Sequence, residues 1–370
     1  MYLKDLVDIQ MGQSPDSKFY NNDKIGLPFY QGKADFGRIN PIPKIWCSKS
    51  KKEAKPNDIL ISVRAPVGDL NINNEQSCIG RGLAAITCKS DVDMMYLYYH
   101  LKYLKPQLKH ISTGSTFESI NRSQLENLII DYKPYFEQIK ISNILQVVQR
   151  QIEVREKLLR LYDLLIKSRF VEIFKNNKAH IAIGELFQVI DGDRGKNYPK
   201  ATDFFDEGYC LFLNAKNVTK NGFCFDTVQF ITQQKDEQLN KGRVLPEDII
   251  LTTRGTVGNV AYCDIKSSHK HMRINSGMVI LRSKDIIYDV DFITYVLSNQ
   301  INYGKEISGS AQPQLPISKL KDIIIPFPEI FLQKDFGYLI KQINKLKSDV
   351  QKSIDETQLL MDSLMQEYFG

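Results

Sequence analysis

Hydrophobic and polar positions follow two different patterns along this chain, and each pattern occurs twice. Residues 1–137 and 178–332 contain short apolar runs, such as DILISV and GMVILR, separated by stretches rich in Gly, Pro and Asn. Such runs predict short strands in a mixed sheet with large loops. Residues 138–177 and 333–370 contain no Pro and carry apolar residues every three or four positions, which predicts a long helix in each. We call residues 1–137 head one and residues 178–332 head two.

The apolar positions of each predicted helix fall on a single stripe, as in a coiled coil. The stripe of the first helix comprises Ile141, Ile144, Val148, Gln151, Arg155, Leu158, Tyr162 and Leu165. That of the second comprises Leu339, Ile343, Leu346, Val350, Ser353, Thr357, Leu360 and Leu364. A helix of 37 residues is roughly 55 Å long, which exceeds the needs of one small core. We therefore expect two antiparallel coiled-coil helices between the heads, although helices that only join two copies of the chain are an alternative.

The two halves of the chain are copies of one unit. LKDLVDIQMG at 3–12 matches IGELFQVIDG at 183–192, at an offset of 180. PNDILISVRAPVG at 56–68 matches PEDIILTTRGTVG at 246–258, at an offset of 190. From GSTFESINRSQLENLII at 114–130 onward the offset is 195, and it stays so through both helices. The heads have therefore diverged while the helices kept their length, and we predict an α+β fold arranged as a tandem repeat with pseudo-two-fold symmetry.

Composition narrows the class of protein only a little. The 370 residues suffice for two or three domains, and a net charge of +6 permits nucleic acid as a partner without requiring it. The six cysteines form no C-x-x-C pair, which disfavours a local zinc or redox motif. The chain has no long apolar run and opens on a polar, acidic segment, so we expect a cytoplasmic protein that does not bind membranes.

A search for catalytic motifs yields weak candidates only. The tetrapeptide NPIP at 40–43 lacks the aromatic residue of an amino-methyltransferase motif, and we interpret it as a turn. Pro15-Asp16 and the segment Glu53-Ala54-Lys55 have the spacing of a metal-dependent nuclease, but the second unit has no counterpart. His269 and His271 have no further ligands nearby, and we interpret His100 as a packed histidine. We expect no catalytic residue and no metal site.

The repeated elements resemble the specificity subunits of type I restriction-modification systems, and the resemblance covers the whole chain. In both halves a G-S element precedes an apolar strand and a long helix: GSTFESI, LENLII and Gln138, then GSAQPQL, LKDIII and Gln333. The opening strands that end at Gly12 and Gly192, the VRAPVG and TRGTVG elements, and DGDRGKNYP at 191–199 are also similar to that family.

The resemblance implies a non-catalytic subunit that reads a bipartite double-stranded DNA sequence with a fixed spacer. It further implies two modification (methyltransferase) subunits and restriction-translocase subunits as partners, with S-adenosylmethionine, ATP and Mg²⁺ bound to those partners and no cofactor on this chain. Because one helix can substitute for the other, we also expect self-association through the helices.

Arginine and lysine reach guanine in the major groove, and asparagine reaches adenine. We therefore predict base-reading residues in polar loops, at Lys18, Asn21, Lys33, Arg38 and Arg81 in head one and at Arg194, Lys196, Asn197, Lys216 and Arg273 in head two. Arg64 in head one and Arg254 in head two occupy equivalent positions of the repeat. They suit phosphate contacts or a structural role better than base reading, because base readers should differ between half-sites. Head one carries 18 basic and 15 acidic residues and head two 18 of each, so the chain alone should bind DNA weakly.

Two other functions remain open at this point. The chain could be the recognition half of a split modification enzyme with residual nuclease activity at Pro15-Asp16. It could also be a scaffold whose heads bind protein; salt-dependent retention on DNA distinguishes that case.

Overall fold

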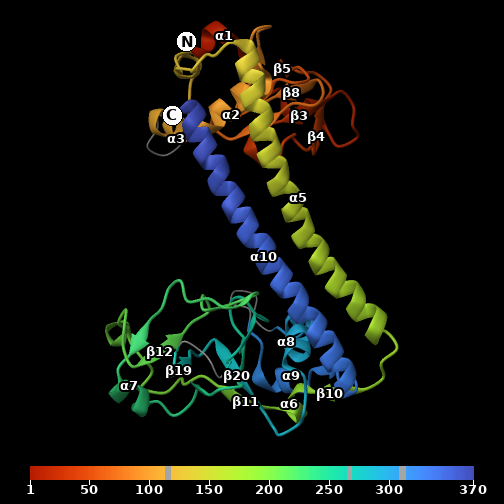
Figure 1. Ribbon diagram of the computed structural model, residues 1–370, viewed down its shortest axis with the longest axis vertical. Coiled ribbons are helices and arrows are strands. Elements are labelled where there is room, and N and C mark those ends of the chain that lie inside the picture. Colours follow the sequence, from red (N-terminus) through yellow and green to blue (C-terminus); the bar gives the residue numbers. More distant parts are fainter. Residues whose placement is uncertain (113–117, 265–268, 308–313) are drawn as a thin grey trace. The chain divides into compact units, whose positions relative to one another are not determined.

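The apolar runs of both heads form strands that are buried on both faces. In the computed structural model, which describes residues 1–112, 118–264, 269–307 and 314–370, every residue of β6 (Ile59–Ser62) and β17 (Ile249–Thr252) is buried. Ile59 and Ile61 pack with residues of helix α2, whereas Leu60 packs with residues of a second sheet. Each head therefore has three layers, with a central sheet between helices and another sheet (Figure 1).

Head one contains a four-stranded antiparallel sheet and a five-stranded mixed sheet. The first has the order β1 (Val7–Met11), β9 (Leu83–Cys88), β6 and β7 (Leu70–Ile72). The second has the order β2 (Tyr20–Asn21), β4 (Ile45–Cys47), β3 (Leu27–Tyr30), β8 (Ser77–Ile79) and β5 (Glu53–Ala54). The helical elements are α1 (Leu3–Leu6), η1 (Ser17–Phe19), η2 (Lys33–Asp35), α2 (Met94–Tyr103), α3 (Lys105–Ile111) and α4 (Arg122–Glu126).

Head two repeats both sheets. Its central sheet has the order β11 (Phe187–Asp191), β20 (Met278–Ser283), β17 and β18 (Val260–Tyr262), and the second has the order β15 (Phe230–Ile231), β12 (Cys210–Leu213), β19 (Met272–Ile274) and β16 (Arg243–Val244). Two short pairs are added, β13 (Val218–Thr219) with β14 (Gly222–Phe223) and β10 (His180–Ala182) with β21 (Ile324–Pro326). The helical elements are α6 (Ile183–Leu186), η3 (Ala201–Asp203), α7 (Gln233–Gln238), α8 (Val290–Asn299), η4 (Tyr303–Lys305) and α9 (Ile317–Asp322).

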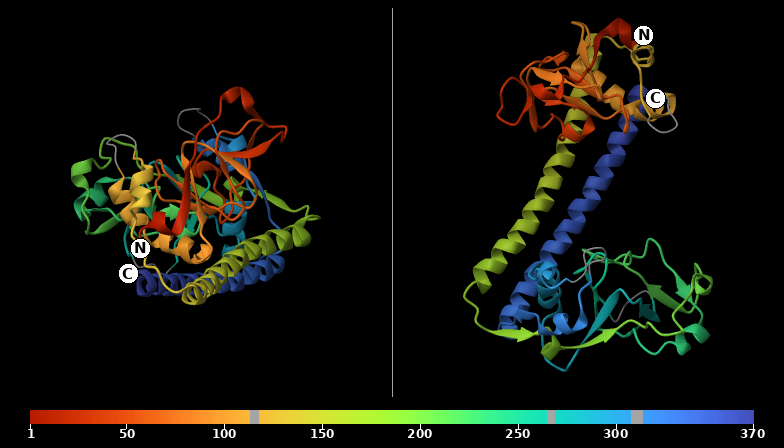
Figure 2. Two further views of the ribbon diagram at one scale, coloured as in Figure 1. Left: turned by 90° about the horizontal axis from the view of Figure 1, so that it is seen from above. Right: turned by 180° about the vertical axis from the view of Figure 1, so that it is seen from behind.

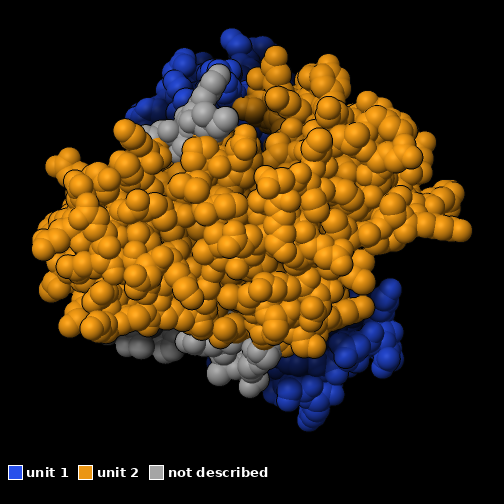
Figure 3. Space-filling model, turned by 90° about the horizontal axis from the view of Figure 1, so that it is seen from below, with its two compact units in different colours: residues 1–158, 350–370 blue, residues 159–349 orange. Residues whose placement is uncertain are grey.

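Two helices of 40 residues follow the heads, α5 (Tyr135–Phe174) and α10 (Ile330–Phe369). They begin at 135 and 330 rather than at 138 and 333: Tyr135 follows Pro134 directly, and Ile330 is the second residue after Pro328. Contacts divide the chain into unit 1 (residues 1–158 and 350–370) and unit 2 (residues 159–349), coloured separately in Figure 3. Each unit therefore contains one head and one end of each long helix, and both termini belong to unit 1 (Figure 2). The predicted α+β fold with an internal repeat is confirmed.

The helices run antiparallel within each unit. In unit 1 the start of α5 packs against the end of α10 through Ile141, Leu145, Met361 and Met365, together with Tyr96 of α2. In unit 2 the end of α5 packs against the start of α10, and both contact α8. The buried residues there include Ile166, Phe170, Phe174, Phe336, Ile340 and Phe292.

The predicted apolar stripe is only partly correct. Ile141, Val148, Ile343 and Thr357 are buried as predicted. Leu165, Leu346 and Leu360 are exposed, and the buried positions lie beside them, at Ile166 for example. The physical reason is that the end of α5 packs against α8 as well as α10. Its apolar residues there are spaced four apart (Ile166, Phe170 and Phe174), and that spacing moves the stripe around the helix.

Candidate nucleic-acid interface

Four loops of head one meet around a hollow of about 710 Å³. They meet because the strand ends from which they leave are in register. Met11 lies opposite Ala84, Ser62 lies opposite Leu83, and the parallel strands β3 and β8 end together. The lining residues are Ser14, Tyr20, Gln31, Gly32, Lys33, Ala34, Asp35, Arg64, Ala65, Pro66, Arg81 and Gly82. We call this cavity the basic hollow.

The basic hollow is lined by positively charged side chains. Lys33, Arg64 and Arg81 contribute three cations, and the side chains of Arg64 and Arg81 are exposed. The carboxylate of Asp35, the acidic residue of the lining, accepts a hydrogen bond from the backbone N–H of Gln31 at 2.7 Å and so shapes its own loop. Exposed guanidinium and ammonium groups around one depression suit contacts with phosphate or with base edges.

Head two places the same loops at equivalent positions. The backbone N–H of Asn275 donates to the Leu213 carbonyl, as that of Gly80 donates to Tyr30. Arg254 and Thr253 both donate to the Gly277 carbonyl, as Val63 donates to Gly82. From the strand registers, Lys216 is equivalent to Lys33 and Arg254 to Arg64.

Six of the predicted residues therefore occupy this loop cluster, three in each head. These are Lys33, Arg64 and Arg81 in head one and Arg194, Lys216 and Arg254 in head two. Lys33 forms an ion pair with Asp69 at 2.9 Å, and Arg194 forms one with Asp191 at 3.2 Å. Both pairs are partly exposed and worth little stability, so the cations stay available to a ligand.

Three further predicted residues lie at the surface near these loops. Lys18 is exposed in η1, with its ammonium 5.2 Å from the centroid of the Phe19 ring. Lys196 is exposed in the loop after β11, where Asn197 donates its amide to the Gln238 carbonyl at 3.2 Å. Their role in reading bases stays a prediction.

Two other predicted base readers, Asn21 and Arg38, make contacts within unit 1. The side-chain oxygen of Asn21 accepts from the backbone N–H of Asp23 and Ile25, and its amide donates to the Ile25 carbonyl at 2.9 Å. The guanidinium of Arg38 reaches α5, where it pairs with Glu156 at 2.9 Å and with Glu153 at 3.5 Å. Asn21 thus closes a turn. The ion pairs of Arg38 are partly exposed, like that of Lys33, and its role in reading bases stays a prediction.

The prediction that Arg273 lies in an exposed loop is wrong. Arg273 is buried in β19, where its guanidinium pairs with the buried Asp236 and donates to the carbonyls of Leu239 and Lys241. The run HMRI that contains Arg273 is short and polar at one end, so its pattern indicated a loop and not a strand. The equivalent position in head one is Cys78, which is also buried. Arg273 therefore stabilises head two and cannot reach DNA.

Residues that sequence reasoning missed hold the loops in place. Asp193 is buried beneath the loop that carries Arg194 and Lys196. Burial alone would raise the pKa of Asp193, but hydrogen bonds from the backbone N–H of Gly195 (2.8 Å) and Asn240 (2.7 Å) hold that pKa below its usual value. Ser14 and Gln31, which line the basic hollow, were also missed. The change of offset between the repeats was the one available signal for these loops.

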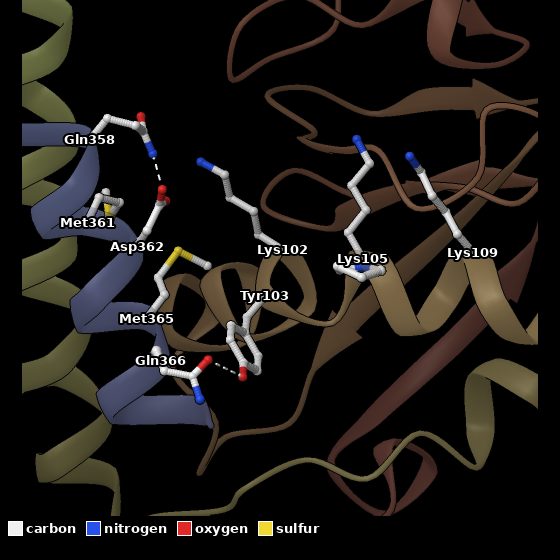
Figure 4. A pocket seen from close by; sticks show the side chains of 10 residues that line it. Lys102, Tyr103, Lys105, Lys109, Gln358, Met361, Asp362, Met365 and Gln366 are labelled. Atoms are coloured by element: carbon white, nitrogen blue, oxygen red, sulfur yellow. Dashed lines mark hydrogen bonds between the residues drawn. The ribbon is translucent and has the colours of Figure 1, made fainter. Parts of the chain in front are cut away.

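A second hollow of about 630 Å³ lies in unit 1 between α2, α3 and the end of α10 (Figure 4). Lys102, Lys105 and Lys109 extend into it from the head, and the Tyr103 hydroxyl donates to the Gln366 side chain at 3.0 Å. Lys105 also pairs with Asp69 at 2.6 Å. This hollow is the joint between the head and the last turns of α10.

The nuclease alternative gains no support from the side chains involved. The Glu53 carboxylate accepts hydrogen bonds from the Ser50 hydroxyl and the Gln76 amide, and Asp16 pairs with Lys51 at 3.4 Å. Hydrogen bonds from Ser50 and Gln76 lower the pKa of Glu53. In the described ranges no group of three or more His, Cys, Asp and Glu side chains is arranged to hold a metal ion.

No described helix has the length and apolarity needed to span a membrane. The G-S elements fall largely outside the described residues, at 114–117 and 309–313.

The chain thus consists of two equivalent α+β heads, each with a basic loop cluster and each followed by a long helix. The family model for the type I restriction modification DNA specificity domain matches residues 1–160 and 176–357. The chain belongs to this family, and the resemblance seen in the sequence is confirmed.

Relatives support the same assignment. The chain is 25% identical over 398 residues to the type I restriction enzyme MjaIX specificity subunit of Methanocaldococcus jannaschii, covering 98% of this chain and 90% of that one. It is 45% identical over 150 residues to the putative MjaX specificity subunit of the same organism, where the match spans 40% of this chain and 35% of the relative. The crystal structure of the type I system S subunit from M. genitalium aligns over 100% of this chain and 95% of that one, with 17% identity and a TM-score of 0.59, which shows a shared fold.

Proposed function

We propose that this chain reads a bipartite double-stranded DNA sequence, one part with each head, within a restriction-modification complex whose catalytic centres lie on other subunits. The observation that carries the proposal is the pair of equivalent basic loop clusters, which share Lys33 with Lys216 and Arg64 with Arg254. Shared cations suit the DNA backbone, which is the same in both half-sites, whereas the diverged loop residues suit different bases.

The small net charge of the heads sets the strength of binding. With +3 on head one and zero on head two, few phosphates are neutralised, so the chain alone binds weakly and its affinity falls with added salt. A partner that surrounds the duplex is therefore needed for tight binding. S-adenosylmethionine, ATP and Mg²⁺ are expected on the modification and restriction-translocase partners.

The surface of each unit supports two copies of one modification partner. Four large apolar residues are exposed in unit 1, and their equivalents 195 positions away are exposed in unit 2. All eight are between 43% and 79% exposed. The pairs are Ile129 with Ile324, Phe136 with Phe331, Leu164 with Leu359, and Leu165 with Leu360. Exposed apolar groups that recur at equivalent positions are typical of a surface that binds the same protein twice.

Charged substitutions of the leucine pairs test this surface. Leu359→Glu with Leu360→Glu should remove the site on unit 1, and Leu164→Glu with Leu165→Glu the site on unit 2. Each variant should bind one modification subunit instead of two, measured as the mass of the purified complex. Ser363→Glu and Ser168→Glu are matched controls on the same helices, since both serines are exposed. Two subunits on every variant would contradict the proposal.

Mapping methylated bases in cells that carry this chain and its modification partner tests DNA reading directly. The proposal predicts one asymmetric motif with two specified parts and an unspecified spacer. If the chain is instead a protein scaffold, the purified protein should show no salt-dependent retention on DNA and no motif should depend on it.

A further inference from the structure

Each head has an arginine at one pair of equivalent loops, but the arginine belongs to a different loop of the pair in each head. The two loops follow β1 and β8 in head one, and β11 and β19 in head two. Gly12 follows β1 and Gly192 follows β11, and in each a Cβ atom would lie 2.2 Å from one carbonyl oxygen, that of Gly80 or of Asn275. Gly80 and Asn275 are therefore equivalent. Counting onward, Ser14 is equivalent to Arg194, and Arg81 is equivalent to Ser276.

Serine and arginine are thus exchanged between the heads. In head one Ser14 belongs to the first loop and Arg81 to the second, and the backbone N–H of Arg81 donates to the Ser14 hydroxyl at 3.3 Å. In head two Arg194 belongs to the first loop, and its guanidinium donates to the carbonyl oxygen of Ser276 in the second at 3.3 Å. Both pairs bridge the same gap, and each head presents one exposed arginine there.

The neighbouring cations are not exchanged. Lys33 and Lys216 follow equivalent strands, and Arg64 and Arg254 follow β6 and β17. In each loop cluster, two cations keep the same position in both heads, whereas one arginine comes from a different loop in each head. This combination suits a site that reads DNA sequence, because contacts with the DNA backbone are common to all sequences and contacts with bases are not.

We propose that Arg81 in head one and Arg194 in head two are specificity-determining residues that each read a guanine, while the unchanged Lys and Arg positions contact phosphates. The proposal rests on the DNA-reading function given above. Arginine binds guanine through two hydrogen bonds, to O6 and N7. The Asp191 carboxylate, 3.2 Å from the Arg194 guanidinium, orients it before DNA arrives. Since the two arginines leave opposite sides of the gap, the guanines should occupy different positions in the two half-sites.

The test is selection of duplexes from a pool with randomised base pairs by the full chain together with its modification partner. The wild-type chain should select a guanine in each half-site. Arg81→Ser should lose the guanine preference at one base pair of one half-site, by roughly 10- to 100-fold, and leave the other half-site unchanged. Arg194→Ser should do the same in the other half-site. Thermal unfolding serves as the folding control, and both exposed substitutions should leave it unchanged.

Lys33→Ser and Lys216→Ser are the contrasting variants. They should weaken binding to all duplexes alike and reduce its salt dependence. If Arg81→Ser and Arg194→Ser behave in this uniform way, the arginines contact phosphate and the proposal is overturned, although DNA reading by the chain stands. If the wild-type chain selects no sequence, DNA reading itself fails and the proposal fails with it.

Discussion

Gln138 and Gln333 each make two equivalent hydrogen bonds in the two units. Each is buried in the first turn of a long helix. The side-chain oxygen of Gln138 accepts from the backbone N–H of Asp93 at 2.9 Å, and that of Gln333 accepts from Asp289 at 3.1 Å. Their amides donate to the carbonyls of Lys133 and Pro328, both at 2.8 Å. Asp93 and Asp289 in turn cap helices α2 and α8, so each glutamine fixes the angle at which its long helix leaves the head.

Replacing either glutamine should destabilise one unit selectively. Gln138→Ala leaves the Asp93 N–H without its partner and should cost unit 1 about 2 kcal/mol, because a buried donor loses both water and its hydrogen bond. Gln333→Ala should have the same effect on unit 2. Urea unfolding followed with a probe in each head measures both effects. Gln342→Ala, an exposed glutamine of α10, is the control. Equal loss in both units from one substitution would argue against a local role.

Arg273 should contribute to stability and not to DNA binding. Arg273→Ala leaves the buried Asp236 carboxylate paired with the half-exposed guanidinium of Arg243 alone, which should cost up to about 3 kcal/mol. Arg273→Met combined with Asp236→Leu removes both charges and should recover most of that loss. The free energy of unfolding of head two measures this, and a single variant as stable as wild type would refute the assignment.

His100 should make unit 1 sensitive to acid. It is buried against the Phe369 ring, with centroids 4.7 Å apart, and burial lowers its pKa from 6.5 to about 4. As the pH falls, the unfolded chain takes up a proton at His100 before the folded chain does. The free energy of unfolding of unit 1 is therefore highest above pH 6.5 and decreases as the pH falls toward 4. The loss at pH 5 should be about 2 kcal/mol. His100→Phe should reduce this dependence, measured as unfolding midpoints at pH 7.5 and pH 5. An identical acid response in that variant would contradict the assignment.

The repeat and the helices could be predicted because they depend on local pattern. Gln138 and Gln333 lie 195 positions apart, as do Phe174 and Phe369, and a constant offset over a proline-free segment identifies two equivalent helices. The same reasoning could not fix which residues face inward near the helix ends. Leu165 is exposed there because contacts with head two, and not only the partner helix, select the buried face.

The loop cluster could not be predicted because its equivalences depend on strand pairing. Ser14 and Arg194 differ by 180 positions, Lys33 and Lys216 by 183, and Arg81 and Ser276 by 195, so no single alignment offset brings them together. The registers of β3 with β8 and β12 with β19 supply the missing relation. Burial was equally hidden for Arg273, since its partner Asp236 is 37 positions away.

A chain that carries head one twice would test the central claim most directly. Residues 178–332 would be replaced by a second copy of residues 1–137, with both long helices kept. If each head reads one half-site by itself, methylation mapping with the modification partner should yield a motif that contains the head-one half-site of the wild type twice, as an inverted repeat in keeping with the predicted pseudo-two-fold symmetry. An unchanged asymmetric motif, or a motif with two new parts, would contradict the claim that the heads read independently.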